Sequence, residues 1–598
     1  MTEERLTKLR ALMKERGVDV YLVPTADFHE SEYVGAYFKS REFLTGFRGS
    51  AGTAVVTKED AVLFTDGRYF IQAEREIKGS GFRLMKMGLP GVPTVREYIT
   101  GVLPEGGVLG FDGRCVNARL AKELLADAEK KKGTLYAEKD LVGEIWEDRP
   151  ALPFSEAWLL PEAYSGESTD KKLARVREKM AEYGASAYIL TSLDDIAWLL
   201  NLRAGDIPHV PVLLSYLMIT PKGCILYASE SALNTEVREA LNAYGVSIAP
   251  YADIYKMADK LAVRSVGKVL LNPAKVNYRI YSAVEKGNEI VDAQDPTLLM
   301  KAVKNPVELA NIRKAHVKDG VALVRWLFWL KNSIGKETLN EYSVETRLEE
   351  FRREQEGFVE PSFKTICAYK DNAAMMHYSA SPDHHAEIFP EGFLLVDSGG
   401  HYLEGSTDIT RTIAVGPLTE EEKHLFTLVL RSNLDLASAH FLKGVTGLNL
   451  DILARGPLWK EGIDYRCGTG HGIGYLLNVH EAPNGFRYKS VPERDDGAPL
   501  VPGMVTTDEP GVYIEGKLGI RTENELICVE DTENEYGQFL CFDTVTLCPI
   551  DLDAVLPEEM SKEERALLNA YHQKVYEALS PYLSNEERLW LRYETREV

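Results

Sequence analysis

The chain has 598 residues and a net charge of −22, from 69 basic and 91 acidic side chains. A negative field of this size opposes binding to DNA, RNA or an anionic membrane surface. The length is too great for one hydrophobic core and predicts three or four domains. With 45% hydrophobic and 27% charged residues, the composition is typical of a soluble enzyme. No apolar run approaches the roughly 18 residues of a membrane span.

The first residues, MTEERLTKLRALMKERG, predict a charged amphipathic helix that lacks the apolar core of a secretion signal. A cytoplasmic location is therefore expected. The seven cysteines are scattered along the chain and include no CxxC pair. This spacing argues against a disulfide framework and against a cysteine-rich zinc site.

The first half of the chain contains a diverged internal repeat. Residues 9–25 and 176–192 align at an offset of 167 positions, with Arg, Met, Glu, Gly and Tyr matched. Each copy predicts an amphipathic helix, a glycine stop and a buried strand, and hairpin strands follow. Two related α/β domains are therefore expected. The alternative is that this common unit matches by chance.

Two domain boundaries can be placed by composition. The proline-bearing stretch 147–163 predicts the first linker, and the second boundary falls near 300–316, where Asn305-Pro306 can start a helix. Beyond it, long helical patterns alternate with strand–turn–strand segments, which is an α+β pattern. The expected helices are 306–332, 340–356, 419–442 and 447–460. The expected domains are 1–155, 156–304 and 305–598, the last with a C-terminal tail from about residue 540.

Five candidate metal ligands lie in this last part: Asp397, Asp408, His471, Glu509 and Glu523. Four carboxylates and one imidazole form an oxygen-rich set, which suits a pair of hard divalent ions better than a structural zinc. The two aspartates are eleven positions apart around a glycine-containing turn, and the two glutamates are fourteen apart around another. Two β-hairpins are expected to bring these ligands together, which predicts a two-metal hydrolase.

The residues around each candidate support its assignment as a metal ligand. Asp397 ends a buried strand, where a carboxylate is costly unless it is paired or bound to metal. Asp408 is expected near the start of a returning strand over 401–415. The alternative for both is an ordinary turn-capping aspartate. His471 lies among alternating glycines in GTGHGIG, which allow close backbone approach, and nearby His480 is expected to support a ligand or the transition state.

The second hairpin has a proline–glycine turn directly after Glu509. Glu523 is expected on the strand that returns from it. The neighbouring acidic residues Asp508 and Glu525 fit a solvated face better than Glu509 and Glu523 do.

Together these motifs resemble the Xaa-Pro aminopeptidase family (aminopeptidase P) in its long three-domain form, within metallopeptidase family M24. The resemblance covers essentially the whole chain. It rests on DFHESEY (27–33), GFRGSAGTA (46–54), TDGRYFIQA (65–73), LDDIAWLLNLRAGDIPHVPV (193–212), MMHYSA (375–380), LLVDSGGHYLEGSTDITRT, GTGHGIGYLLNVHEAP, EPGVY, GIRTEN and the closing segment 569–595. It implies two creatinase-like α/β domains followed by a pita-bread metallopeptidase domain.

The resemblance also implies a site. The five candidates match ligands of two divalent ions, most often Mn²⁺, with Co²⁺ or Zn²⁺ as alternatives, and Asp408 and Glu523 would bridge them. The matched substrate-site residues are His377, His480, Tyr513 and Arg521. The implied reaction releases the first residue of a peptide with proline second, through a hydroxide shared by the two metals. Glu509, His480 and His377 would be catalytic. A homodimer is implied as well.

This sequence departs from the family pattern at Cys467, where the family usually has a histidine, and at Thr507 and Asp508, where it usually has asparagine or serine. Cys467 is interpreted as a passive substitution, with an extra thiol ligand as the alternative. The rival functions are a prolidase-type dipeptidase with the same fold and metals, a metal-free creatinase-type hydrolase and a non-catalytic partner-binding module. The five intact ligands argue against the last two. A serine hydrolase lacks its GxSxG motif.

Overall fold

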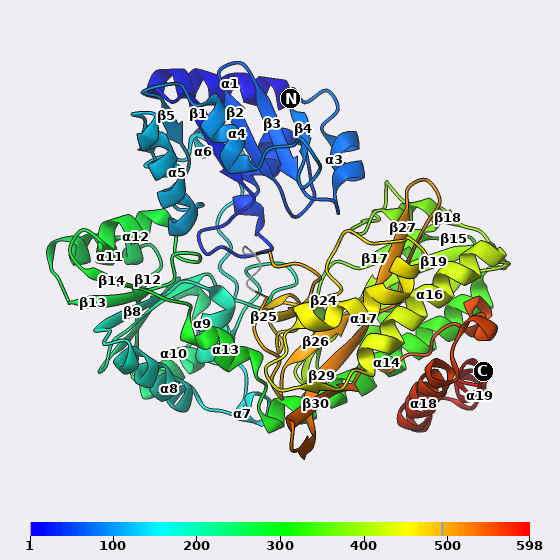
Figure 1. Ribbon diagram of the computed structural model, residues 1–598. Helices are drawn as coiled ribbons and strands as arrows, with labels where there is room; N and C mark the ends of the chain where they lie inside the picture. Colours follow the sequence, from blue (N-terminus) through cyan, green and yellow to red (C-terminus); the bar gives the residue numbers. More distant parts are fainter. Residues whose placement is uncertain (1, 492–495) are drawn as a thin grey trace. The chain divides into compact units, whose positions relative to one another are not determined.

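The computed structural model describes residues 2–491 and 496–598 (Figure 1), and the chain divides into two units. The first unit runs up to Leu160 and resumes over Glu167–Thr297. The second consists of Pro161–Gly166 and Leu298–Val598.

The first unit contains the two copies of the repeat. Helices α1 (Thr2–Arg16) and α8 (Thr169–Glu182) each bury apolar residues at a spacing of three or four, which faces one side of the helix to the core. Gly17 and Gly184 follow them with φ values of 69° and 65°, the left-handed conformation that ends a helix. Strands β1 (Val20–Pro24) and β8 (Ala187–Leu190) come next.

Each repeat builds a six-stranded sheet around that strand, and the two sheets have the same topology. The first has the order β4-β3-β2-β1-β5-β6 and the second β12-β11-β10-β8-β13-β14. In each, the central strand is antiparallel to one neighbour and parallel to the other. The prediction of two related α/β domains is therefore confirmed. The remaining strands are β2 (Thr53–Thr57), β3 (Ala61–Thr65), β4 (Arg83–Lys86), β5 (Val108–Gly110), β6 (Thr134–Tyr136), β10 (Ser215–Ile219), β11 (Cys224–Ala228), β12 (Val246–Pro250), β13 (Lys268–Leu271) and β14 (Glu289–Asp292).

The first sheet is covered on both faces. Along β1, Tyr21 and Val23 pack with α1, whereas Val20 and Leu22 pack with residues of α4 (Val95–Val102) and α5 (Ala118–Lys130). Because side chains alternate between the two faces of a strand, a continuous apolar run is what this three-layer arrangement requires. In the second domain the main helices besides α8 are α9 (Leu193–Leu199), α10 (Thr235–Ala243), α11 (Asp253–Val263) and α12 (Tyr278–Val284).

The long helices of the second unit lie within a few residues of the predicted ranges. They are α14 (Pro306–Ser333), α15 (Glu341–Arg353), α16 (Glu420–Ala437) and α17 (Gly447–Lys460). The Asn305 side chain accepts hydrogen bonds from the N–H groups of Val307 and Glu308, and the Glu308 side chain accepts from the N–H of Asn305. This capping box, with Pro306 in the first turn, explains why α14 begins where predicted.

Short sheets carry the rest of the second unit. The largest has the order β23-β30-β29-β26-β24-β25. The others among the described residues are β17-β19-β22, β16-β20-β21, β27-β28 and a pair formed by β15 (Leu339–Asn340) and β18 (Glu387–Ile388). Their strands are β16 (Phe358–Pro361), β17 (Ile366–Tyr369), β19 (Phe393–Ser398), β20 (Gly400–Tyr402), β21 (Gly405–Ser406), β22 (Ile409–Ala414), β23 (Phe441–Leu442), β24 (Gly470–Gly472), β25 (Glu481–Phe486), β26 (Val505–Asp508), β27 (Gly511–Ile514), β28 (Leu518–Arg521), β29 (Asn524–Asn534) and β30 (Gly537–Thr544).

Both predicted ligand hairpins are interrupted, which corrects the expectation of simple turns. β19 pairs with β22, but the chain between them forms β20 and β21 in a separate sheet, so 401–415 is not one strand. A Cβ on Gly399 would lie 1.8 Å from the carbonyl oxygen of Thr407. Only glycine therefore fits at this position, where the chain passes from β19 to β20. Likewise β26 pairs with β29, while β27 and β28 form their own hairpin. Glu523 therefore lies in the break before β29, not on that strand.

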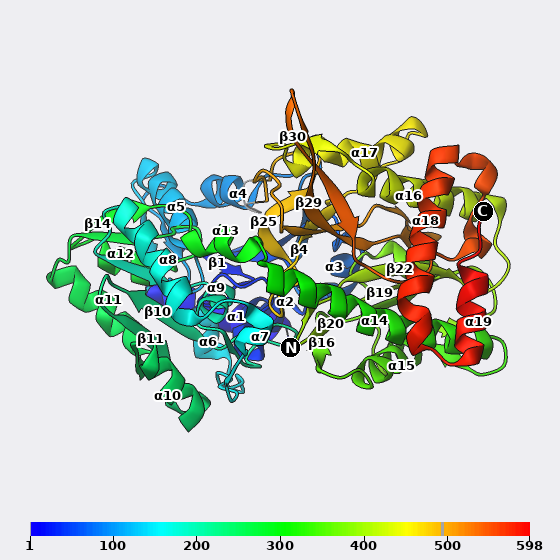
Figure 2. The same ribbon diagram turned by 90° about the horizontal axis from the view of Figure 1, so that it is seen from below.

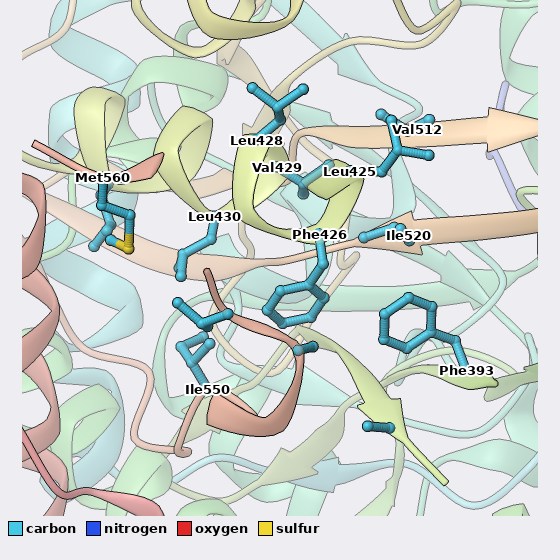
Figure 3. Packing of buried hydrophobic residues seen from close by; sticks show 14 of the residues in the cluster. Phe393, Leu425, Phe426, Leu428, Val429, Leu430, Val512, Ile520, Ile550 and Met560 are labelled. Carbon is cyan, nitrogen blue, oxygen red and sulfur yellow. The ribbon is translucent and has the colours of Figure 1, made fainter. Parts of the chain in front are cut away.

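Helix α16 supplies much of the core of the second unit (Figure 3). Its Phe426 is 1% exposed and stacks on Phe393 of β19, with ring centroids 5.7 Å apart. Met560 and Leu568 of the C-terminal segment belong to the same cluster. That segment, with α18 (Lys562–Leu579) and α19 (Asn585–Glu594), is therefore packed into the core.

Replacing Phe426 with alanine should lower the free energy of unfolding of the second unit by about 3–5 kcal/mol, because it removes a buried ring and leaves a cavity. Urea unfolding followed by fluorescence measures this. The matched control is Leu589→Ala on α19, where the side chain is 68% exposed and the cost should stay below about 1 kcal/mol. Equal effects of the two variants would contradict the core assignment.

His572 of α18 makes the stability of this unit depend on pH. Its ring is buried, and its Nε2 accepts the N–H of Ile550 at 3.1 Å. Burial lowers the pKa of His572 from 6.5 to about 3. Between these values the unfolded chain binds a proton that the folded chain does not, so acidification favours unfolding.

The free energy of unfolding should accordingly fall by up to about 1.4 kcal/mol per pH unit from this one group, as pH drops from about 6 towards 4. A His572→Gln variant should show a shallower slope over that range, whatever its absolute stability. Parallel slopes in urea unfolding at several pH values would show that His572 does not carry the effect.

Candidate metal centre

The structure brings the predicted ligands together at the points where strands of different sheets diverge. Asp397 lies near the end of β19, Asp408 directly precedes β22, and Glu509 and Glu523 lie between strands. The donor atoms of Asp408, His471 and Glu523 all lie within 4.8 Å of one another. His471 Nε2 is 3.6 Å from Asp408 Oδ2 and 3.4 Å from Glu509 Oε1. Residues more than a hundred positions apart thus face one small volume.

The glycines around His471 are needed for strand packing. A Cβ on Gly470 would lie 1.9 Å from the carbonyl oxygen of Thr507, and one on Gly472 would lie 2.2 Å from that of Glu481. Contacts this short are impossible, so only glycine lets β24 approach β25 and β26 closely. The close approach expected from the GTGHGIG motif is therefore confirmed, and it holds the His471 backbone beside Thr507.

Buried negative charge dominates the centre. The pKa of Asp408 is raised well above its ordinary value by burial and then by the charges of Asp397 and Glu509. Burial raises the pKa of Glu523 in the same way, with Asp408 as the largest charge contribution. Glu509 also has a raised pKa because of its burial, although Arg521 opposes the shift. Like charges at this spacing are unfavourable unless protons or cations neutralise them.

The residues fit divalent cations. Asp397 Oδ1 is buried and has no hydrogen-bond partner in the structure, so this acceptor atom is left without a protein donor. Carboxylate oxygens with one imidazole are the donor set that hard divalent ions prefer. A cation would both satisfy that oxygen and remove the mutual repulsion of the carboxylates.

Two neighbouring acids are buried, so the prediction that Asp508 and Glu525 lie on a solvated face is wrong. Both are 0% exposed, in the stretch where β26 pairs with β29. Glu525 Oε1 accepts the N–H of Asp408 at 2.7 Å, and its Oε2 lies 3.2 Å from His316 Nε2. Glu525 thus holds the backbone of a candidate ligand. Asp508 has a raised pKa, first because of burial and then because of Glu509.

Among the candidate substrate residues, His480 and Arg521 adjoin the ligands, and Tyr513 contacts Arg521. The His480 ring stands nearly perpendicular to that of His471, with centroids 4.2 Å apart. The buried guanidinium of Arg521 donates to the hydroxyl of Tyr513 at 2.7 Å and to Asp397 Oδ2 at 2.5 Å. His377 lies half-buried in the turn after the 3₁₀ helix η3 (Lys370–Ala374), an element packed against β28. The functional roles of these residues stay predictions.

Cys467 lies beside this network as a partly buried thiol. Burial raises the pKa of Cys467 to about 11, with a further contribution from the charge of Glu509. A thiol with so high a pKa is protonated near neutral pH and is a poor nucleophile. Among the described residues, the grouped donor atoms at the centre are those of Asp408, His471 and Glu523.

Sequence reasoning missed several supporting residues. The Thr410 hydroxyl donates to Glu523 Oε2 at 2.8 Å. Glu481, which follows His480, is buried in ion pairs with Lys304 and with Lys301, the latter at 3.2 Å. A buried charge flanked by two partners fixes the start of β25, directly after His480. No spacing signal marks this group, because the lysines lie about 180 positions away along the chain.

The fold and this centre define a metallopeptidase, and comparisons with known proteins agree. The model of metallopeptidase family M24 matches residues 310–530, and the model of its C-terminal region matches 538–598. Creatinase/prolidase N-terminal domain models match 5–136 and 148–308. The chain belongs to metallopeptidase family M24, and the predicted fold class is confirmed. The exact domain boundaries stay predictions.

Similar proteins cover the whole chain. A probable Xaa-Pro aminopeptidase P of Paracoccidioides brasiliensis is 38% identical over 100% of this chain and 99% of its own, and one of Aspergillus flavus is 40% identical over 100% and 93%. The crystal structure of an X-prolyl aminopeptidase from Caenorhabditis elegans, described as a cytosolic enzyme with a di-nuclear active site, matches with a TM-score of 0.95 at 33% identity, over 100% of both chains.

A more partial likeness is to a Xaa-Pro dipeptidase from Bacillus anthracis. It is 26% identical and covers 64% of this chain and 99% of its own, with a TM-score of 0.51. Among the described residues, no helix is long and apolar enough to cross a membrane.

Proposed function

We propose that this chain is a metal-dependent aminopeptidase that releases the first residue from peptides with proline in second position. The buried cluster of four carboxylates and His471 carries the proposal, because such a cluster requires cations. Likeness over the full chain to Xaa-Pro aminopeptidases supports the substrate class.

Two divalent ions would be held by the five candidate ligands, Asp397, Asp408, His471, Glu509 and Glu523. We favour Mn²⁺, because four carboxylates with one imidazole match its preferences, with Co²⁺ or Zn²⁺ as alternatives. When bound, such a metal pair lowers the pKa of a water molecule and so makes a nucleophile available near neutral pH.

The protein side chains would orient the substrate and move its protons. The scissile amide of an Xaa-Pro bond is tertiary and has no N–H, so the leaving nitrogen must gain a proton. Glu509, whose side chain is 21% exposed, would deliver it. His480, perpendicular to His471, would donate to the developing oxyanion. His377, Tyr513 and Arg521 would contact the peptide.

The alternative is a dipeptidase of the prolidase type, which has the same kind of fold. The dipeptidase likeness covers 64% of this chain, whereas the aminopeptidase likeness covers all of it. A three-peptide assay separates the two. Arg-Pro-Pro should be cleaved to release arginine, Arg-Ala-Pro should be cleaved at least about tenfold more slowly, and Gly-Pro should be a poor substrate. Cleavage of Gly-Pro alone would assign a dipeptidase.

We further propose that the enzyme is a homodimer that works in the cytoplasm on peptides. Sequence reasoning isolated no exposed apolar stripe, but α17 presents Leu448, Ile452 and Trp459 at 46%, 48% and 42% exposure. These positions recur at helical spacing, and exposed apolar patches mark association surfaces. Sedimentation of wild type and of Trp459→Glu tests the dimer. A wild-type chain that sediments as a monomer would refute it.

A further inference from the structure

A second group of side chains that could bind a metal lies elsewhere in the same large sheet. The candidate metal centre uses β24 and the ends of β26 and β29. The second group spans β23, β30 and β29, at the far edge in the strand order. It consists of His440, Asp531 and Cys541, and their nitrogen, oxygen and sulfur donor atoms all lie within 4.8 Å of one another.

Strand register explains why these three side chains meet. Phe441 of β23 pairs with Leu540 of β30, so the preceding residue, His440, comes opposite Cys541. On the other side, Cys541 pairs with Val529 of β29. Asp531 is two positions further along β29, in the stretch between Glu530 and Glu533 where the pairing with β30 shifts register, and its carboxylate contacts His440 there. Directly opposed side chains have Cβ atoms about 5 Å apart, which brings donors from three strands to one spot.

The contacts already present favour a cation. His440 Nδ1 lies 2.8 Å from Asp531 Oδ2. The charges of Asp531 and Asp543 add to burial in raising the pKa of the Cys541 thiol, so the local field is negative. The His440 and Asp531 side chains are 63% and 27% exposed, so an ion can reach them from solvent. Figure 2 shows the β29–β30 hairpin that carries two of the three donors.

The donor set selects the kind of ion. One thiolate, one imidazole and one carboxylate match Zn²⁺, which binds such ligands at about 2.0–2.3 Å. A tetrahedral ion at those distances needs ligand atoms about 3–4 Å apart, which small side-chain rotations would give here. Mn²⁺ and Mg²⁺ prefer all-oxygen sites and would be poorly held by sulfur.

We propose that His440, Asp531 and Cys541 form a separate site for a borderline divalent cation of the Zn²⁺ type, with solvent in the remaining position. Binding deprotonates the Cys541 thiol and releases that proton to solvent. The bound ion cross-links β23, β30 and β29. The chain thereby binds two classes of metal at separate sites: hard ions at the oxygen-rich centre, and a softer ion at this thiol-containing edge of the sheet.

Cobalt(II) tests this proposal, because sulfur ligation gives a near-ultraviolet charge-transfer band that an oxygen-rich site does not. Full-length protein is first saturated with Mn²⁺, freed of excess metal and titrated with Co²⁺. We expect the band to saturate near one equivalent, to vanish in Cys541→Ser and to persist in Cys467→Ser. His440→Ala should weaken Co²⁺ binding at least about tenfold.

Gel filtration and circular dichroism of each variant establish that it is folded. Absence of the band in the wild type, its persistence in Cys541→Ser, its loss in Cys467→Ser or half-saturation only at millimolar Co²⁺ would each overturn the site. In that case His440 and Asp531 are an ordinary surface ion pair, and Cys541 takes no part in metal binding.

Discussion

Replacement of Glu523 by glutamine should lower kcat/KM for an Xaa-Pro peptide by about 10³-fold or more. The substitution keeps the shape of the side chain but removes one negative charge from the cluster that would hold the metals. Because changes to groups that merely support metal ligands cost about 10–100-fold, loss of one of the candidate ligands themselves should cost more. Glu523 is 1% exposed, and its donor atom lies within 4.8 Å of those of Asp408 and His471.

The matched control lies on the strand that follows. Glu533→Gln changes the same chemical group at an exposed position of β29 and should leave kcat/KM unchanged within about twofold. Steady-state kinetics and metal analysis of both variants measure the effect. A Glu523→Gln enzyme that keeps wild-type activity and metal content would remove Glu523 from the ligand set.

The second large effect is expected at His480. Alanine at this position should lower kcat by about 10²–10³-fold with metal content unchanged, as loss of one oxyanion donor does elsewhere. The ring is 4.2 Å from that of His471, which places it beside the ligands without making it one of the grouped donors.

His385→Ala provides the control, since that histidine is exposed, and its activity should match the wild type. Separate kcat and KM values, with metal analysis, distinguish the roles. A His480→Ala enzyme that has lost metal would make His480 part of metal binding, and one with unchanged kcat would exclude it from the reaction.

Several parts of this structure could be predicted from the sequence because they depend on local signals. The helix–glycine–strand repeat predicted two α/β domains, and the two sheets have the same strand order. The capping residues at Asn305 placed the start of α14. The five ligand candidates were picked out by residue type and by turn residues. The structure groups the donor atoms of Asp408, His471 and Glu523, with Glu509 Oε1 3.4 Å from His471 Nε2.

Other features could not be predicted because they depend on which strands become neighbours. Between β19 and β22, and again between β26 and β29, the chain forms strands that belong to separate sheets. The alternation of apolar and polar residues along a strand gives no sign of this. Asp508 and Glu525 look like solvated residues in the sequence, but the part of the sheet where β26 pairs with β29 is covered, and both side chains are buried. The contact of His316 with Glu525 joins positions more than two hundred residues apart, so no local motif contains it.

The metal dependence of Xaa-Pro cleavage is the most direct test of the whole account. Purified protein is stripped with a chelator, restored with up to two equivalents of Mn²⁺ per chain and assayed for release of arginine from Arg-Pro-Pro. We predict no release from stripped protein, full recovery near two equivalents and no recovery in Glu523→Gln. Arginine release that survives complete metal removal would contradict the metallopeptidase assignment, and absence of release with two equivalents bound would contradict the proposed substrate.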